Sequence, residues 1–192
     1  MTVLALTASP RRQGNSELLL GSFLKGVQSE GLETETIRLN DLTFRPCQAC
    51  DRCAPTGKCV VQDDMQTLYP KIISCSALIL TTPIYFGSLS AQLKMFIDRF
   101  QCWWHAKYNL DKPFIKPEEK RPAYFICVGA LKKKDYSESA KNIVSVYCHI
   151  VNLNLKGSLC FRGYDEPGSI AQAPEHLERA FQEGAAFAKV LK

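Results

Sequence analysis

Short apolar runs alternate with amphipathic helical patterns along almost the whole chain. Five runs have the length and composition of strands: 2–8, 33–39, 77–83, 123–130 and 155–161. Five segments carry apolar residues at helical spacing: 15–31, 63–73, 90–100, 137–151 and 174–191. Such an alternation predicts one α/β domain over residues 1–192, a doubly wound fold with helices on both faces of a five-stranded parallel sheet.

The segments between the predicted elements are candidates for a binding site. Three loops leave the predicted carboxyl ends of strands, where doubly wound sheets bind their ligands: 9–16, 83–89 and 129–136. Two longer stretches, 44–62 and 101–120, show neither a helical nor a strand pattern. Long irregular segments in a compact domain are usually functional, so these two stretches join the three loops as candidates.

Composition excludes several classes of protein. The net charge is 24 − 19 = +5, and the single lysine run has no interleaved aromatic residues, so nucleic-acid binding is not expected. The opening "MTVLALTASPRR" has no basic segment before its short apolar run, and no run reaches the length of a membrane span. We therefore expect a cytoplasmic protein without membrane contact, whose cysteines stay reduced.

The first loop, "SPRRQGNS", connects a buried strand to the N-terminus of a helix. Its candidate ligand-binding residues are Ser9, Arg11, Arg12, Gly14, Asn15 and Ser16. Hydroxyl and amide groups, two guanidinium groups and the free amides of a helix start together favour an anion. Neither G-x-G-x-x-G nor G-x-x-x-x-G-K-[ST] occurs, so a phosphomonoester such as that of FMN fits better than a dinucleotide or a nucleoside triphosphate. The alternative is a plain capped turn with solvated arginines.

The second loop, "TTPIYFGS", also follows a buried strand. Its candidate residues are Pro83, Ile84, Tyr85, Phe86 and Gly87. Pro83 and Gly87 favour a turn, and two aromatic side chains at a polar loop tip suggest a flat partner such as a ring. The alternative is that both aromatic side chains pack on the following helix.

Four of the nine cysteines, Cys47, Cys50, Cys53 and Cys59, fall in "CQACDRCAPTGKC" with the spacing C-x2-C-x2-C-x5-C. Such a tight run is typical of iron–sulfur ligation, because successive thiolates can wrap one cluster. Zinc sites with four cysteines usually use two separated pairs, so zinc is the weaker alternative, and an empty or vestigial site is the other. Three further cysteines lie in apolar runs and are expected to act as small buried hydrophobes: Cys75, Cys127 and Cys160.

Taken together, "SPRRQGNS", "CQACDRCAPTGKC" with the following "DDM", and "TPIYFGSLSAQLKMFIDR" resemble the iron–sulfur flavoprotein family, within the flavodoxin-like NADPH-dependent FMN reductase superfamily. The resemblance implies a sheet of order 2-1-3-4-5, with the cysteine-rich insertion 44–62 after strand 2. It implies that Ser9, Arg11, Asn15 and Ser16 hold the FMN phosphate, and that the isoalloxazine lies against residues 83–87. It also implies a homodimer or homotetramer. The third loop, "GALKKKDYS", lacks the glycine-rich sequence of many flavin reductases of this fold.

The function implied is that of an electron-transfer flavoprotein containing FMN and a [4Fe–4S] cluster. It would pass electrons between a one-electron carrier such as ferredoxin and a two-electron acceptor, and this needs no side-chain acid or base. No catalytic residue is therefore predicted. Two alternatives remain open: a cluster-free NAD(P)H-dependent FMN or quinone reductase, and a non-catalytic flavin- or metal-binding module.

Two further groups could contact partners. The aromatic residues Trp103, Trp104 and Tyr108 in "QCWWHAKY" are interpreted as a subunit interface, with a cap over the flavin as the alternative. The lysine run Lys132, Lys133 and Lys134 is a solvated loop or a docking patch for an acidic ferredoxin.

Overall fold

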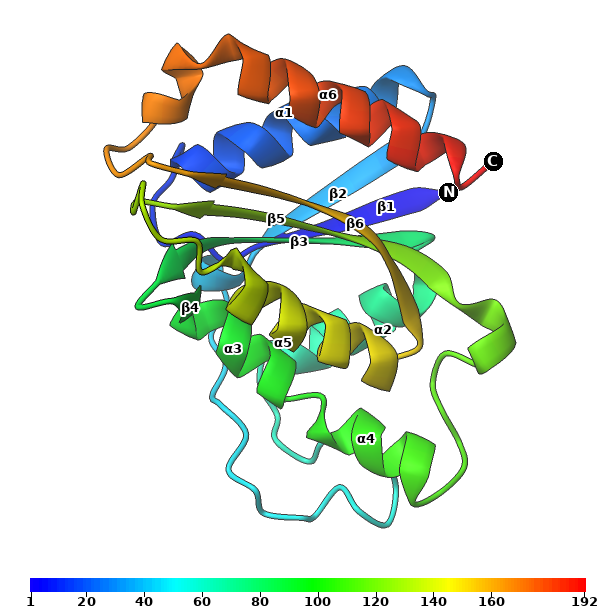
Figure 1. Ribbon diagram of the computed structural model, residues 1–192. Helices are drawn as coiled ribbons and strands as arrows, with labels where there is room; N and C mark the ends of the chain where they lie inside the picture. Colours follow the sequence, from blue (N-terminus) through cyan, green and yellow to red (C-terminus); the bar gives the residue numbers. More distant parts are fainter.

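The computed structural model describes residues 1–192 and contains one six-stranded sheet (Figure 1). Its strands are β1 (Thr2–Thr7), β2 (Glu33–Arg38), β3 (Ala77–Tyr85), β4 (Ser88–Leu89), β5 (Arg121–Gly129) and β6 (Leu153–Arg162). The order is β2-β1-β3-β5-β6, all parallel, and β4 pairs antiparallel with the end of β3. Because β4 is only a short hairpin strand, the five long strands have the order 2-1-3-4-5 predicted for a flavodoxin-like fold.

Helices cover both faces of the sheet, as predicted. Figure 1 shows α1 (Asn15–Ser29) and α6 (Pro174–Lys189) on one face, with α2 (Met65–Ser74), α3 (Ala91–Asp98) and α5 (Ser137–Ile150) on the other. A further helix, α4 (Gln101–Tyr108), lies beyond α3, farther from the sheet. Three short 3-10 turns complete the fold: Leu39–Asp41, Pro117–Glu119 and Ser169–Gln172.

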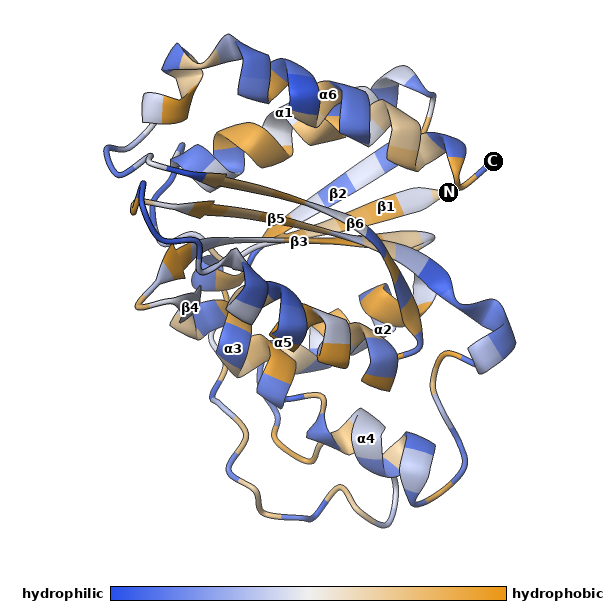
Figure 2. Ribbon diagram, in the orientation of Figure 1, coloured by the Kyte–Doolittle hydropathy of each residue, from blue (hydrophilic) through white to orange (hydrophobic).

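The core has two halves, one on each side of the apolar strands that Figure 2 colours orange. On the side of α1 and α6, Phe23 packs against Tyr124 and Phe187, with ring centroids 4.6 and 5.8 Å away. The two helices touch closely, because a Cβ at Gly26 would overlap the carbonyl of Phe181. On the other side, aromatic rings of α2, α3, α4 and α5 form a larger cluster. Both faces of the sheet are therefore covered by packed side chains.

The prediction of an irregular segment over 101–120 is wrong for its first part, because residues 101–108 form α4. Trp103 is 4% exposed and packs on Phe100 and Phe114, with ring centroids 4.9 and 5.0 Å away. It therefore belongs to the core and not to an exposed interface. Trp104 and Tyr108 remain at least partly exposed.

One smaller expectation also needs correction. The N-cap residue of α1 is Gly14, which makes no side-chain hydrogen bond. Cys75 and Cys127 are buried as predicted, whereas Cys160 is only partly buried. Its sulfur lies 2.8 Å from the sulfur of Cys127. None of the helices combines the length and the apolar composition that crossing a membrane requires.

Candidate cofactor sites

Two adjoining cavities open at the carboxyl edge of the sheet. The large cavity, about 520 Å³, lies between the β3–β4 hairpin, residues 129–137 and the end of β6. The small cavity, about 120 Å³, lies between the 9–16 turn, the end of β3 and residues 164–167. Ile84, Tyr85 and Ala130 line both cavities. The combined space is in the range of small-molecule sites, roughly 300–1,000 Å³.

The 9–16 turn surrounds the N-terminus of α1 and lines the small cavity. Ser9 Oγ accepts a hydrogen bond from the amide of Arg11 (3.2 Å) and donates one to the Arg11 carbonyl (3.0 Å). A Cβ at Gly14 would lie only 3.3 Å from Ser9 Oγ, so the turn is closely packed there. The first amides of a helix lack intrahelical partners, and the Arg11 guanidinium lies beside them. These groups suit an anion.

Asn15 ties this turn to a distant segment. Its Nδ2 donates to the carbonyls of Tyr164 (3.3 Å) and Glu166 (3.0 Å), and its Oδ1 accepts from the amide of Ile170 (3.0 Å). Arg11 adds a hydrogen bond to the carbonyl of Asp165 (2.9 Å). The side chain of Asn15 is thus engaged in shaping the small cavity, a role that its sequence context did not indicate.

Arg12 points elsewhere. Its guanidinium forms a bidentate pair with Asp41, at 2.9 and 3.0 Å, and its side chain is 71% exposed. It lines neither cavity. Of the two neighbouring arginines predicted to hold a phosphate, the structure therefore places only Arg11 at the small cavity.

The β3–β4 hairpin brings residues 83–87 to the rim of both cavities. Tyr85 pairs with Ser88, and the two residues between them, Phe86 and Gly87, have φ values of 48° and 77°. Two positive φ values in a two-residue loop are the geometry of a type I′ turn. A positive φ is uncommon for a non-glycine residue and often marks a functional position. Phe86 is also fully exposed, so its ring is not packed on the following helix.

The third loop, residues 129–136, forms one wall of the large cavity, although no ligand contact was assigned to it from the sequence. Gly129, Lys134 and Tyr136 line the large cavity, and an Asx turn holds the loop, in which the amide of Ser137 donates to Asp135 Oδ1 (2.8 Å). Phe161 at the end of β6 completes the wall. Its only sequence signal is its position after a buried strand, since no motif distinguishes it.

The cysteine loop lies away from the sheet, below α3 and beside α4 (Figure 1). The four predicted ligands, Cys47, Cys50, Cys53 and Cys59, all line one small cavity of about 30 Å³. Gly57 has a φ of 71°, and a Cβ there would lie 2.6 Å from the Cβ of Ala106, so only glycine fits against α4. The four residues line one space, yet no three metal-binding side chains have the arrangement of a metal site.

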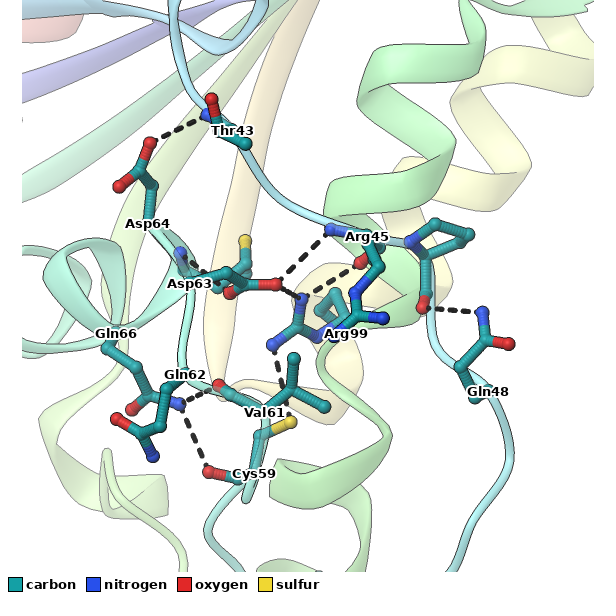
Figure 3. A network of polar contacts seen from close by, with 12 residues as sticks. Thr43, Arg45, Gln48, Cys59, Val61, Gln62, Asp63, Asp64, Gln66 and Arg99 are labelled. Carbon is teal, nitrogen blue, oxygen red and sulfur yellow. Dashed lines mark hydrogen bonds and ion pairs between the residues drawn. The ribbon is translucent and has the colours of Figure 1, made fainter.

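Polar contacts fasten the two ends of this loop to each other (Figure 3). Asp63 Oδ2 accepts from Arg99 (2.6 Å) and from the amide of Arg45 (3.2 Å), and Asp64 Oδ2 accepts from the amide of Thr43 (2.6 Å). Arg99 also donates to the Arg45 carbonyl (2.8 Å) and to Cys59 Sγ (3.3 Å). These contacts place a buried positive charge against one of the four sulfurs.

Charge and burial shift the pKa values of two groups of the cysteine loop, Asp63 and Cys53. Burial alone would raise the pKa of Asp63, but hydrogen bonds from Arg99 and from the amide of Arg45 lower it overall. Burial raises the pKa of Cys53, and the neighbouring thiols Cys59, Cys47 and Cys50 raise it further. A cation would remove this mutual repulsion, which is the usual effect of a metal on clustered thiolates.

Comparison with known proteins agrees with the fold. A family model described as NADPH-dependent FMN reductase matches residues 1–158. The solved structure of the Trp repressor binding protein from Bacillus subtilis is 28% identical, with a TM-score of 0.64, covering 94% of this chain and 97% of that one. The NAD(P)H:quinone oxidoreductase from Methanothermobacter marburgensis, 20% identical with a TM-score of 0.70 and coverages of 96% and 94%, supports the fold alone.

A curated relative is similar to about half of the chain. An iron-sulfur flavoprotein of Methanocaldococcus jannaschii is 42% identical over 99 residues, 52% of this chain and 51% of that protein. The match thus spans about half the length of that relative, whereas the family model covers most of this chain. On the strength of the family match and of the parallel sheet with its edge cavities, the chain belongs to the NADPH-dependent FMN reductase family of flavin-dependent oxidoreductases.

Proposed function

We propose that the protein binds FMN at the carboxyl edge of its sheet and a [4Fe–4S] cluster in the cysteine loop. It would pass electrons between a one-electron carrier such as ferredoxin and a two-electron acceptor. The observation that carries the flavin part is the joined pair of cavities, one polar at a helix N-terminus and one with aromatic walls. A phosphate attached to a flat ring has the chemistry that such a pair would accept.

The residues around the small cavity would hold the phosphate. Ser9, Arg11, Ser16 and the first amides of α1 provide donors and positive charge there. Asn15 would act through its hydrogen bonds to residues 164–170, which shape the cavity. Arg12 would act through its charge alone. These roles refine the residue set expected from the sequence without adding a side-chain acid or base.

The hairpin at 83–87 would hold the ring. Its backbone groups lie at the cavity rim, and the exposed side chains of Tyr85 and Phe86 could cover a ring or exclude water from it. Bound FMN supplies the exchange of one or two electrons, and the protein supplies position and electrostatics. A second subunit in a homodimer or homotetramer would be a natural cover for Phe86.

The donor set of the cysteine loop fits an iron–sulfur cluster in its chemistry. Four thiols line one cavity, and Arg99 provides an N–H···S contact of the kind that tunes such clusters. A volume of about 30 Å³ accommodates roughly one water molecule, so a cluster requires the loop to widen. The segment around Cys50 is exposed and carries left-handed φ values at Ala49 and Asp51, so it is the part that would move.

The same observations favour one second candidate. Because no three sulfurs are arranged for a metal, the protein could act as a cluster-free NAD(P)H-dependent flavin or quinone reductase. The two functions differ in their electron source. Rapid loss of flavin absorbance on adding NADPH alone would support the second candidate, and reduction only through a one-electron carrier would support the first.

Anaerobic purification tests both cofactors together. We expect FMN in the extract, broad iron–sulfur absorbance, and matching iron and sulfide contents. Replacing Cys53→Ala should abolish iron and sulfide while FMN stays bound, and Cys75→Ala, a buried cysteine outside the loop, is the matched control. Protein that is colourless and stays colourless after incubation with FMN would contradict the flavin site. Normal iron content in the Cys53 variant would contradict the ligand assignment.

A further inference from the structure

Cys127 and Cys160 form a thiol pair that the proposed electron transfer does not use. They lie directly opposite each other on the neighbouring parallel strands β5 and β6. Their sulfur atoms are 2.8 Å apart, the one hydrogen bond in the protein between two thiols. Both side chains pack against the same half of the core, so they point to the same face of the sheet.

The backbone geometry permits a covalent link between them. Neighbouring strands lie about 4.8 Å apart, and disulfides span Cα separations of about 4.4–6.8 Å. From 2.8 Å, the two sulfurs need to approach by only about 0.8 Å to reach the length of an S–S bond. No rearrangement of the sheet is needed.

The two sulfurs are chemically unequal. The hydrogen bond from Cys127 lowers the pKa of Cys160 against the opposing effect of burial, and the nearby charge of Lys141 lowers it further. The same hydrogen bond, together with burial, raises the pKa of Cys127. Cys160 is therefore the better nucleophile, because the thiolate is the reactive form, and Cys127 is suited to react second.

A small oxidant can reach the pair. Cys127 lines the large cavity, which is open at the carboxyl edge of the sheet, and Cys160 is partly exposed. Of the other cysteines outside the loop, Cys75 and Cys148 are buried and make no hydrogen bond to a second thiol, whereas Cys102 is buried and lines the cavity of the cysteine loop. The pair thus combines access, an activated sulfur and a resolving sulfur, which is the pattern of redox-sensitive cysteines.

We propose that Cys127 and Cys160 are a reversibly oxidisable pair, which hydrogen peroxide reaching the partly exposed Cys160 converts to a disulfide that links β5 to β6. The Cys160 sulfur attacks one peroxide oxygen, the O–O bond breaks, and one water leaves as a sulfenic acid forms. The Cys127 sulfur then attacks the Cys160 sulfur, and the second water leaves. Two thiols and one peroxide become one disulfide and two waters, and a dithiol reductant restores the thiols.

Peptide mapping of the purified protein tests this directly. Trypsin places the two cysteines in separate peptides with one cysteine each, residues 121–132 for Cys127 and 157–162 for Cys160. After peroxide treatment, trapping of free thiols with N-ethylmaleimide and digestion without reductant, we expect these two peptides to be lost in equal amounts and one linked species to appear. Dithiothreitol added before trapping should restore both. The peptide of Cys148, residues 142–156, is the control in the same digest and should remain trapped as a free thiol.

Two variants sharpen the result. Cys160→Ser should leave Cys127 without a partner and abolish the linked species, whereas Cys148→Ser should form it as the original protein does. The proposal is overturned if the peptides of Cys127 and Cys160 stay free while peroxide oxidises the loop cysteines. It is equally overturned if either one is found joined to a loop cysteine, or if the Cys148 peptide is oxidised as fast. The readout needs neither flavin nor iron, so its outcome does not depend on the proposed function.

Discussion

The two candidate cofactor sites are built in opposite ways. At the sheet edge, the polar groups of the turns already bond within the chain: Ser9 with Arg11, and Asn15 with residues 164–170. The cysteine loop is fastened at its ends, by Asp63, Asp64 and Arg99, while the segment around Cys50 is exposed. The first site has an open cavity of about 520 Å³, and the second has a cavity of about 30 Å³ lined by the four cysteines and their neighbours. The fold preorganises the edge cavities, whereas the cysteine loop would have to change shape to hold the proposed cluster.

The largest expected effect comes from removing the ion pair between Asp63 and Arg99, which holds the ends of the cysteine loop together. The Arg99 side chain is 1% exposed, and Asp63→Asn would leave its charge without an anionic partner. Removing one partner of a buried ion pair lowers the free energy of unfolding by about 3–5 kcal/mol, which urea denaturation would measure. The matched control is Asp98→Asn, whose exposed pair with Lys94 contributes about 0.3–0.5 kcal/mol. Equal losses in both variants would contradict the special role of the loop anchor.

The ion pair between Asp63 and Arg99 has a predicted pH dependence. The pKa of Asp63 is lower in the folded protein than in the unfolded chain, because its hydrogen bonds outweigh the effect of burial. The contribution of Asp63 to the free energy of unfolding is therefore fully present above about pH 4, near the pKa of the unfolded chain. It is lost as the pH falls through the pKa of the folded protein. The difference in unfolding free energy between the original protein and Asp63→Asn should shrink in that window. A difference that is constant down to pH 2 would exclude this linkage.

Next in size is the contrast between the two arginines of the 9–16 turn. Arg11→Ala removes a guanidinium at the small cavity, and charge-assisted hydrogen bonds contribute about 1.5–3 kcal/mol, or at least about tenfold in the Kd for FMN. Arg12→Ala removes one that is paired with Asp41 outside the cavity, so a smaller, salt-sensitive loss is expected. Flavin fluorescence titration measures both, and riboflavin, which lacks the phosphate, should bind both variants alike. Equal losses of FMN affinity would contradict the placement of the phosphate.

A smaller effect is expected from filling the large cavity. A Cβ at Gly129 would meet Ile84 at 3.6 Å, an ordinary contact, so Gly129→Leu should fold and place its side chain in the space proposed for the ring. We expect the Kd for FMN to rise about tenfold, equivalent to about 1.4 kcal/mol, with little change in Tm. Gly21→Leu, at an exposed position of α1 with no atom within 4 Å, is the control. Unchanged FMN affinity in the Gly129 variant would place the ring elsewhere.

The smallest effect concerns the docking of a partner. Lys132 and Lys133 are exposed beside the large cavity, and reversing both to Glu should slow reduction by an acidic ferredoxin at low salt. The Kd for FMN and the Tm should stay unchanged, and Lys25→Glu on α1 is the control. The difference should vanish at high ionic strength, because exposed charges are screened there. Identical rates at low salt would contradict a docking role for these lysines.

The sequence predicted the fold well, and it predicted that two loops meet at one edge of the sheet, for a physical reason. Apolar periodicity is a local property, so the five long strands and most helices follow from it within a few residues. The carboxyl ends of parallel strands meet at one edge, which brought residues 9–16 and 83–87 together. The same reasoning missed α4 and took Trp103 for an interface residue. The ring partners of Trp103 include Tyr69 and Phe114, which lie in other segments.

What the sequence by itself determined is the sheet, its order and the list of groups able to bind a phosphate, a ring or iron. Only the tertiary structure decided which of those groups face a common space: Arg11 and not Arg12, Asn15 with residues 164–170, and Cys127 with Cys160. Asn15 and its partners are 149 to 155 positions apart in the chain. No local pattern carries such a contact, because it arises only when the packed sheet brings separate loops to the same edge.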